Sequence, residues 1–209
     1  MIEKPLVLAT RNQGKIGEFK ALLSDFHIEI KSLQDFGPLP PIKEDGSTFE
    51  ENAYKKAHLT AKMLGLPVLA DDSGLMVDAL GGNPGVHSAR YAGEKASDQQ
   101  NNLKLLEAMA GVKNRKATFK CVIIIAVPLG PALTYEAVCH GEITHEMKGA
   151  HGFGYDPVFY YPPLKRTFAQ MSIEEKNRVS HRGKAMAELK DEFDKVLVWL
   201  RQRLSEEPF

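Results

Sequence analysis

The sequence has no excess of charge of either sign. Its 209 residues include 27 Lys and Arg and 27 Asp and Glu, so the formal net charge is zero. Nucleic acids and anionic membrane surfaces attract proteins through an excess of positive charge. The balance argues against a nucleic-acid-binding protein, and it means that any anion site must be built from a local group of residues.

Long hydrophobic runs and a cysteine framework are also missing. The longest apolar run, residues 122–127, is far shorter than the ~20 residues that a membrane-spanning helix needs. The apolar residues 6–9 are too few for a secretory signal, and no cleavage site follows them. The two cysteines, Cys121 and Cys139, lack the spacing of metal ligands and are expected to be buried free thiols. These features predict a soluble protein of the reducing cytoplasm that binds no membrane.

The length and the 43% hydrophobic content are those of a globular protein with a sizeable core, in one domain or two closely packed lobes. Residues 67–93 contain the segment that most suggests a functional site. Its apolar run, residues 68–70, is followed by Asp71 and Asp72, which predicts a buried strand that ends in two acids at the edge of a sheet. Consecutive strand side chains point to opposite faces, so we expect only one of the two acids to enter a site. Acids at this position often only cap a loop, and that alternative remains open.

The first strand and helix are predicted around a loop that contains glycine. Residues 6–9 resemble a buried strand, residues 10–15 a loop, and the spacing of the apolar residues from Ile16 onward predicts an amphipathic helix. A strand, loop and helix in this order can bind an anion through backbone N–H groups and the helix dipole. Lys15 in the first helical turn opposes that dipole, which a bound phosphate would offset. A solvated lysine is the alternative.

A second helix is predicted to start after the turn that carries Glu44. Either Ser47 with Glu50 or Thr48 with Glu51 forms the capping box. Lys56 lies on this helix. Glu44 is well placed to reach a metal ion, although a solvated loop glutamate is the more common case.

Two more strands and two more capping boxes are predicted after residue 93. Residues 118–127 are β-branched and predict a buried strand, and residues 133–140 predict its hairpin partner. Ser97 with Gln100, and Ser172 with Glu175, have the spacing of capping boxes.

A glycine-rich patch, residues 149–157, places aromatic rings between glycines. Such rings can be exposed to a planar ligand such as a nucleobase, but aromatic residues that fill a core beneath a loop are at least as common. His181 and Arg182 come just before a long predicted helix, where they oppose the dipole as Lys15 does. Acids, helix-start cations and aromatic rings between glycines together suit a nucleotide with phosphates. Asp72 and Glu44 would hold magnesium, which takes oxygen ligands and bridges phosphates.

Five segments in this order resemble the Ham1/RdgB-like inosine triphosphate pyrophosphatases. They are LATRNQGKIGEF, EDGSTFEENAYKKA, LADDSGLMVDALGGNPGVHSARYAG, GFGYDPVF and SHRGKA. The resemblance implies an α/β fold in which an elongated mixed β-sheet with flanking helices forms two lobes around a central cleft, within one domain spanning residues 1–209. It also implies a homodimer that uses Mg²⁺ to hydrolyse ITP, dITP and XTP to the monophosphate and pyrophosphate.

The resemblance also assigns the site residues. It makes Asp72 the proton acceptor and a metal ligand, and Glu44 the second metal ligand, although the run Lys43-Glu44-Asp45 leaves that match open by one residue. The positions that match its phosphate contacts are Thr10, Arg11 (through its backbone only), Asn12, Gln13, Gly14, Lys15, Lys56 and Lys176. The positions that match its nucleoside contacts are Ser73, Phe153, Gly154, Tyr155, Asp156, His181 and Arg182.

These roles make chemical sense for such a substrate. Hypoxanthine and xanthine carry an oxygen acceptor at position 6, where adenine carries an amino donor. Arg182 or His181 donating to that oxygen would be left without a partner opposite adenine, and such sites can discriminate by ~10⁴–10⁵. Three alternatives remain: a Maf-type pyrophosphatase that prefers other bases, a nucleotide sensor without catalysis, and a nucleic-acid-binding protein, which the charge balance disfavours.

Overall fold

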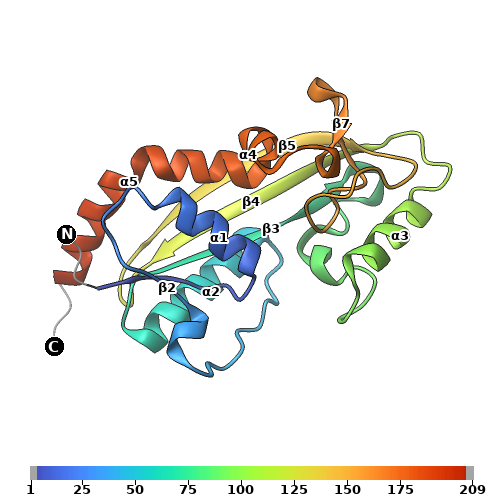
Figure 1. Cartoon of the computed structure of the whole chain (residues 1–209). Helices are drawn as coiled ribbons and strands as arrows, with labels where there is room; N and C mark the ends of the chain where they lie inside the picture. Colours follow the sequence, from blue (N-terminus) through green and yellow to red (C-terminus); the bar gives the residue numbers. More distant parts are fainter. Residues whose placement is uncertain (1–3, 206–209) are drawn as a thin grey trace. The chain divides into compact units, whose positions relative to one another are not determined.

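The structure is a computed structural model that describes residues 4–205 (Figure 1). Its α-helices are α1 (Gln13–Leu22), α2 (Phe49–Leu64), α3 (Asp98–Ala108), α4 (Ile173–Val179) and α5 (His181–Ser205). Its strands are β1 (Leu6–Leu8), β2 (Ile30–Ser32), β3 (Val68–Val77), β4 (Lys116–Ala126), β5 (Ala132–Ile143), β6 (Phe159–Tyr161) and β7 (Arg166–Thr167).

The strands form one mixed sheet in the order β2-β1-β3-β4-β5-β6-β7. Strand β1 pairs in parallel with β2 and with β3, whereas β6 pairs antiparallel with β5 and with β7. The predicted α/β class with a mixed sheet is therefore confirmed, and the two strands expected around residues 118–140 are present as the neighbours β4 and β5.

The chain divides into two compact units, each made of several segments. Unit 1 comprises Met1–Asp72, Val122–Glu136 and Ala185–Phe209, and unit 2 comprises Ser73–Cys121 and Ala137–Lys184. Strands β3, β4 and β5 and helix α5 contribute residues to both units. The boundary in β3 falls at the peptide bond between Asp72 and Ser73.

The core of unit 1 is built from the apolar runs and stripes that the sequence contains. Strand β1 is fully buried, and so is the first part of β3. Helix α2 buries Ala53, Ala57 and Ala61, which lie four residues apart and therefore on one face. Helix α5 buries Leu189, Phe193, Val196 and Leu200, which are three or four residues apart, in the same way.

Strand β3 differs from the prediction. The expected strand ended at Ala70, but β3 runs through Asp71 and Asp72 to Val77. The hydrogen bonds between strands are made by backbone N–H and C=O groups, and a carboxylate side chain does not block them. The acids are tolerated inside the sheet because Lys15 and Lys56, from two different helices, supply positive charge next to them. The acids thus lie in the interior of a strand and not at a strand end.

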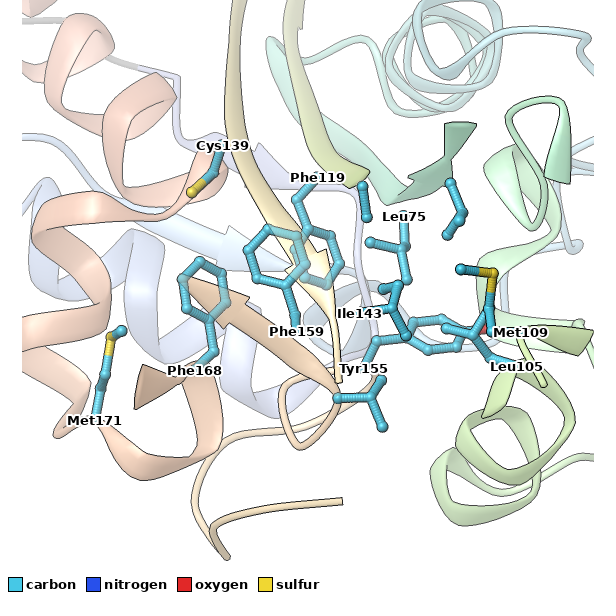
Figure 2. Packing of buried hydrophobic residues seen from close by; sticks show 13 residues of the cluster. Leu75, Leu105, Met109, Phe119, Cys139, Ile143, Tyr155, Phe159, Phe168 and Met171 are labelled. Atoms are coloured by element: carbon cyan, nitrogen blue, oxygen red, sulfur yellow. The ribbon is translucent and has the colours of Figure 1, made fainter. Parts of the chain in front are cut away.

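Unit 2 has its own cluster of buried hydrophobic residues, and Figure 2 shows how they pack. Phe119 lies close to both Phe159 and Phe168, with ring centroids 4.6 and 5.8 Å apart. Leu105 and Met109 bring α3 into this cluster. Cys139 belongs to it as well, and both cysteines are buried thiols outside any disulfide, as predicted.

The capping boxes fix where the helices begin. For α2 the structure uses Thr48 with Glu51 and not Ser47 with Glu50: the N-cap Thr48 hydroxyl accepts the Glu51 N–H, and the Glu51 carboxylate accepts the N–H of Ser47, one residue before the cap, at 2.6 Å. The boxes predicted at Ser97 and Ser172 begin α3 and α4. Helix α5 begins at His181, so the basic residues expected before it lie in its first turn. Among residues 4–205, none of the helices combines the length and the apolar composition needed to cross a bilayer.

Candidate active site

The loop before α1 is ordered by its own side chains. The Asn12 side chain caps the helix by accepting the Lys15 N–H at 3.1 Å, and the Asn12 N–H is donated to the Thr10 hydroxyl at 3.1 Å. Arg11 donates to the backbone carbonyl of Leu39 at 3.2 Å, and its side chain is thus directed to another loop. The N–H groups of Gln13 and Gly14 are among the first four of the helix, which have no partner within a helix and can bind an anion.

Lys15 is held by a buried acid. Its ammonium lies 2.8 Å from Asp71 Oδ2, and the Asp71 side chain is 1% exposed. The alternative of a solvated surface lysine is therefore wrong. The ion pair gives Lys15 a structural reason to occupy the first helical turn, because Asp71 offsets the unfavourable dipole.

Lys56 lies between two carboxylates. Its ammonium is 3.2 Å from Glu44 Oε2 and 3.5 Å from Asp72 Oδ1, and its side chain is 13% exposed. Burial alone would lower the pKa of Lys56, but the carboxylates of Asp72, Asp71 and Glu44 raise it overall. Lys56 is therefore a charged ammonium, and it holds one acid from the loop before α2 next to one acid of β3.

The carboxyl group of Asp72 has a raised pKa. Burial is the largest cause, and the nearby charge of Glu44 adds to it, whereas Lys56 and Lys15 act in the opposite direction. A raised pKa makes the carboxylate a better proton acceptor near neutral pH. Lys15 and Asp72, which the sequence analysis assigned to one nucleotide, thus belong to one charged cluster in unit 1.

The neighbours of Glu44 have different partners. Asp45 pairs with Lys55 and with Lys43, the latter at 3.6 Å. The Asn52 side chain, which the sequence analysis did not include, accepts the Gly46 N–H at 2.8 Å and holds the turn that carries Glu44. Of the three consecutive residues Lys43, Glu44 and Asp45, Glu44 is the one that shares a lysine with Asp72.

The donor set of the charged cluster fits magnesium. Among residues 4–205, no group of three or more His, Cys, Asp or Glu side chains is arranged to hold a metal ion. Magnesium, however, is often held by one or two carboxylates, with waters and substrate phosphates as the other ligands. Glu44 and Asp72 are two such carboxylates, and Asp72 Oδ2 is buried with no hydrogen-bond partner among these residues. An oxygen of this kind is suited to bind a cation.

Unit 2 contains the second group of predicted residues. Asp156 is 2% exposed, accepts the Phe153 N–H at 2.9 Å and forms an ion pair with Lys176 of α4. Burial raises the pKa of Asp156, and Lys176 is the main group that opposes the rise. A side chain at Gly152 would collide with the Asp156 carboxylate, which explains the glycine there. The loop is thus folded around one buried acid.

The Phe153 ring is 41% exposed and has two cations near it. The Lys176 ammonium lies 4.5 Å and the Arg182 guanidinium carbon 5.4 Å from its centroid. Arg182 Nη2 also donates to the Ser73 hydroxyl at 2.9 Å. The resemblance assigned Lys176 to the phosphates. In the structure Lys176 contacts Asp156 and Phe153, two residues that the resemblance assigned to the nucleoside.

His181 and Tyr155 are held in the interior of unit 2. The His181 ring stacks on Phe119, with centroids 4.5 Å apart and an interplanar angle of 6°. Tyr155 is 4% exposed, belongs to the buried cluster and donates its hydroxyl to the Ser88 carbonyl at 2.8 Å. The core alternative therefore describes the Tyr155 side chain, and of the two aromatic residues considered for base stacking only Phe153 is exposed.

The two groups of residues offer different chemistry. Unit 1 brings together Lys15, Lys56, Glu44 and Asp72, which can bind phosphates and a divalent cation and accept a proton. Unit 2 brings together an exposed ring, a lysine, an arginine and a histidine, which can bind a flat molecule with oxygen acceptors. Sequence reasoning missed Asn52, which holds the turn that carries Glu44, and Phe119, which stacks on His181.

Comparison with known proteins identifies the family. The Ham1 family model matches residues 6–192. A dITP/XTP pyrophosphatase of Syntrophobacter fumaroxidans is 61% identical over 202 residues, which are 97% of this chain and 87% of that protein. A dITP/XTP pyrophosphatase of Geobacillus kaustophilus is 49% identical over 196 residues, 93% of this chain and 96% of that protein.

Solved structures agree with this result. A HAM1 protein from Coxiella burnetii has a TM-score of 0.87 and 44% identity, covering 92% of this chain and 99% of that chain. The Staphylococcus aureus Ham1 protein has a TM-score of 0.85 at the same identity and coverage. A family model that matches most of the chain, relatives at this identity and structures of the same fold lead to one conclusion: the chain belongs to the Ham1 family.

Proposed function

We propose that this protein hydrolyses the non-standard purine nucleoside triphosphates ITP, dITP and XTP to the monophosphate and pyrophosphate. One observation carries the proposal: the Lys56 ammonium joins Glu44 and Asp72 in a partly buried cluster that also contains Lys15. Such a cluster suits a triphosphate with its metal ion. The relatives named dITP/XTP pyrophosphatase support the choice of substrate.

Residues of unit 1 would bind the triphosphate and the metal ion. Glu44 and Asp72 would hold Mg²⁺, which, when bound, neutralises phosphate charge and favours departure of pyrophosphate. The phosphates would contact Lys15, Lys56 and the backbone of the loop of residues 10–15. This loop includes the N–H groups of Gln13 and Gly14 at the start of α1.

Asp72 would accept the proton of the attacking water. Both cysteines are buried and are poor candidates for a nucleophile. A water held next to a carboxylate can attack the α-phosphorus instead. The raised pKa of Asp72 brings its basicity closer to that required at neutral pH. Lys56 keeps the carboxylate ionised by opposing part of the effect of burial.

Residues of unit 2 would bind the nucleoside. The base would contact the exposed Phe153 ring, and Arg182 or His181 would donate to the oxygen at position 6 of the purine. Ser73 holds the guanidinium of Arg182, and Asp156 fixes Lys176 and the Phe153 backbone. For Tyr155 we propose a backbone contact, since its side chain is in the core. For Gly154 we propose a contact through its α-carbon, since its N–H and carbonyl are bonded to other side chains.

The experiment that tests the proposal is a pyrophosphate-release assay with Mg²⁺ across ITP, dITP, XTP, GTP and ATP. We expect turnover of the first three and little of ATP. Binding of ITP without pyrophosphate release would indicate a sensor instead, and a preference for bases other than these purines would indicate a Maf-type enzyme. Running the reaction in ¹⁸O-water should place the label in the monophosphate, and label in pyrophosphate would move the attack to the β-phosphorus.

We also propose that the protein is a cytoplasmic homodimer. The family resemblance supports the dimer, and two buried cysteines outside any disulfide support a reducing compartment. Light scattering coupled to size-exclusion chromatography should give twice the 23.2 kDa mass of one chain. A single-chain mass at micromolar concentration would contradict the dimer.

A further inference from the structure

Two residues of α3 hold the glycine next to Phe153. Asp98 Oδ2 accepts the Gly154 N–H at 2.6 Å, and Asn102 Nδ2 donates to the Gly154 carbonyl at 2.8 Å. The N–H belongs to the peptide group between Phe153 and Gly154, and the carbonyl belongs to the peptide group that follows. Both peptide groups that flank this α-carbon are therefore fixed by one helix.

Gly154 needs such support because of its conformation. Its φ of +61° lies in the left-handed region, a turn conformation that favours glycine. Gly154 lies between the exposed Phe153 and the buried Tyr155. Asp156 already holds both backbone groups of Phe153, and the two hydrogen bonds from α3 fix the residue that follows it.

Helix α3 is itself firmly held, so it can act as a support. Leu105 is fully buried in the core of unit 2. The Asn101 side chain accepts the Ala92 N–H at 2.8 Å and donates to the Ala89 carbonyl at 3.1 Å. Asn102 is 2% exposed and also donates to the carbonyl of Asp98 at 2.9 Å. Gly154 is thus bonded to two side chains of a packed helix, of which Asn102 is buried and Asp98 is exposed.

We propose that Asp98 and Asn102 are positioning residues for substrate binding. They act through Gly154, by holding the Phe153 ring where the base contacts it, and they touch no substrate themselves. This inference rests on the proposed function, because it assumes that Phe153 contacts the purine. It assigns to α3, which carries none of the predicted site residues, the task of ordering the base-binding loop.

The first test is steady-state kinetics of Asn102→Ala and Asp98→Ala with ITP and Mg²⁺. Each variant loses one hydrogen bond to Gly154, so we expect KM to rise roughly 3- to 10-fold while kcat stays within about twofold. Asp98→Asn keeps an oxygen acceptor but loses the charge, so it should restore most of the loss. Gln99→Ala, an exposed change in the same helical turn, should match the wild type.

A purely structural role would give a different result. It would lower the melting temperature and the fraction of active enzyme, and so kcat, with KM unchanged. An unchanged KM in both alanine variants, or no rescue by Asp98→Asn, overturns the proposal. The double variant should cost less than the product of the two single effects, because both bonds hold the same residue.

Amide hydrogen exchange separates this inference from the proposed function. Peptides covering residues 152–158 should exchange faster in Asn102→Ala than in the wild type or in Gln99→Ala, whatever the substrate proves to be. If the wild type releases no pyrophosphate from ITP, the proposed function fails, and exchange alone then decides whether α3 holds the loop. Unchanged exchange in that loop overturns the inference even if the enzyme is active.

Discussion

The charged cluster of unit 1 and the aromatic cluster of unit 2 are built in opposite ways. In unit 1, cations and anions from separate elements pair directly: Lys15 with Asp71, and Lys56 with Glu44 and Asp72. In unit 2, the exposed Phe153 ring is held indirectly, through its backbone and through cations near its face. The first arrangement fixes charges, and the second fixes the direction of a ring.

The two arrangements predict which kinetic constants a substitution in each unit should change. Removing a charge from unit 1 leaves an oppositely charged, partly buried partner uncompensated and removes a group that acts on phosphate, so both kcat and KM should respond. Removing a contact from unit 2 loosens a binding surface, so KM and selectivity between bases should respond most.

The largest effect is expected for Asp72→Asn. The amide has nearly the shape of the carboxylate but cannot accept the proton, so kcat for ITP should fall about 10²–10⁴-fold. Pyrophosphate release measures the loss, and circular dichroism checks the fold. Asp194→Asn, an exposed acid on α5, is the control and should keep full activity. Full activity in the Asp72 variant would remove that residue from the mechanism.

Lys56→Met should come next. The loss of a charged hydrogen-bond donor should lower kcat/KM about 10- to 100-fold. Lys56 is also the main group that lowers the pKa of Asp72, so its removal should raise that pKa further. The acid side of the pH–rate profile should therefore move to higher pH. Lys62→Met, an exposed change on the same helix, should leave the profile in place, and an unshifted profile in the Lys56 variant would contradict the coupling.

Arg182→Ala and His181→Ala test the base-recognising residues. If either residue donates to the oxygen at position 6, its loss should reduce the ITP/ATP ratio of kcat/KM about 10- to 100-fold. The control is Arg178→Ala, an exposed arginine on α4. An unchanged ratio in both variants would show that selection against ATP lies elsewhere.

Phe153→Leu should have a smaller effect. Stacking of a base on an aromatic ring contributes about 1–3 kcal/mol, so KM for ITP should rise about tenfold with kcat nearly unchanged. Leu164→Ala removes an apolar side chain that is 40% exposed, against 41% for Phe153, and should not alter KM. Equal KM values for the Phe153 variant and the wild type would leave the ring without a role in binding.

Cys139 should give the smallest effect on activity. Burial raises the pKa of its thiol to about 11, so the reactive thiolate is scarce at pH 8. We expect a thiol reagent to modify neither cysteine in the folded protein at pH 8 and both after unfolding in urea, with native activity unaffected. Because the pKa of Cys139 is raised, its thiolate forms, and its reaction accelerates, only as the pH approaches 11. Rapid modification at pH 8 would show that the interior of unit 2 opens.

Local sequence patterns predicted most helix starts and strands, for identifiable reasons. The capping boxes at Ser97 and Ser172 work through residues three positions apart, so a single sequence is enough to find them. The end of β3 could not be found in this way. Two consecutive acids usually end a strand, and the lysines that make them tolerable belong to α1 and α2.

The same limit applies to the site. Motif resemblance named Phe153 and Tyr155 together, but only the packing of unit 2 shows that one ring is exposed and the other is in the core. Asp98 and Asn102 have no motif of their own, because their importance comes from a glycine more than 50 residues later in the chain, at separations of 56 and 52 residues.

The sequence by itself determined the fold class, the family and the chemical kind of the site. Apolar periodicity and short-range caps are properties of neighbouring residues, and the five motifs are carried in order along the chain. Only the tertiary structure decided which acid pairs with which lysine, and which aromatic ring remains exposed. Those outcomes depend on contacts between residues distant in sequence, where burial and charge act through space and leave no periodic pattern in the chain.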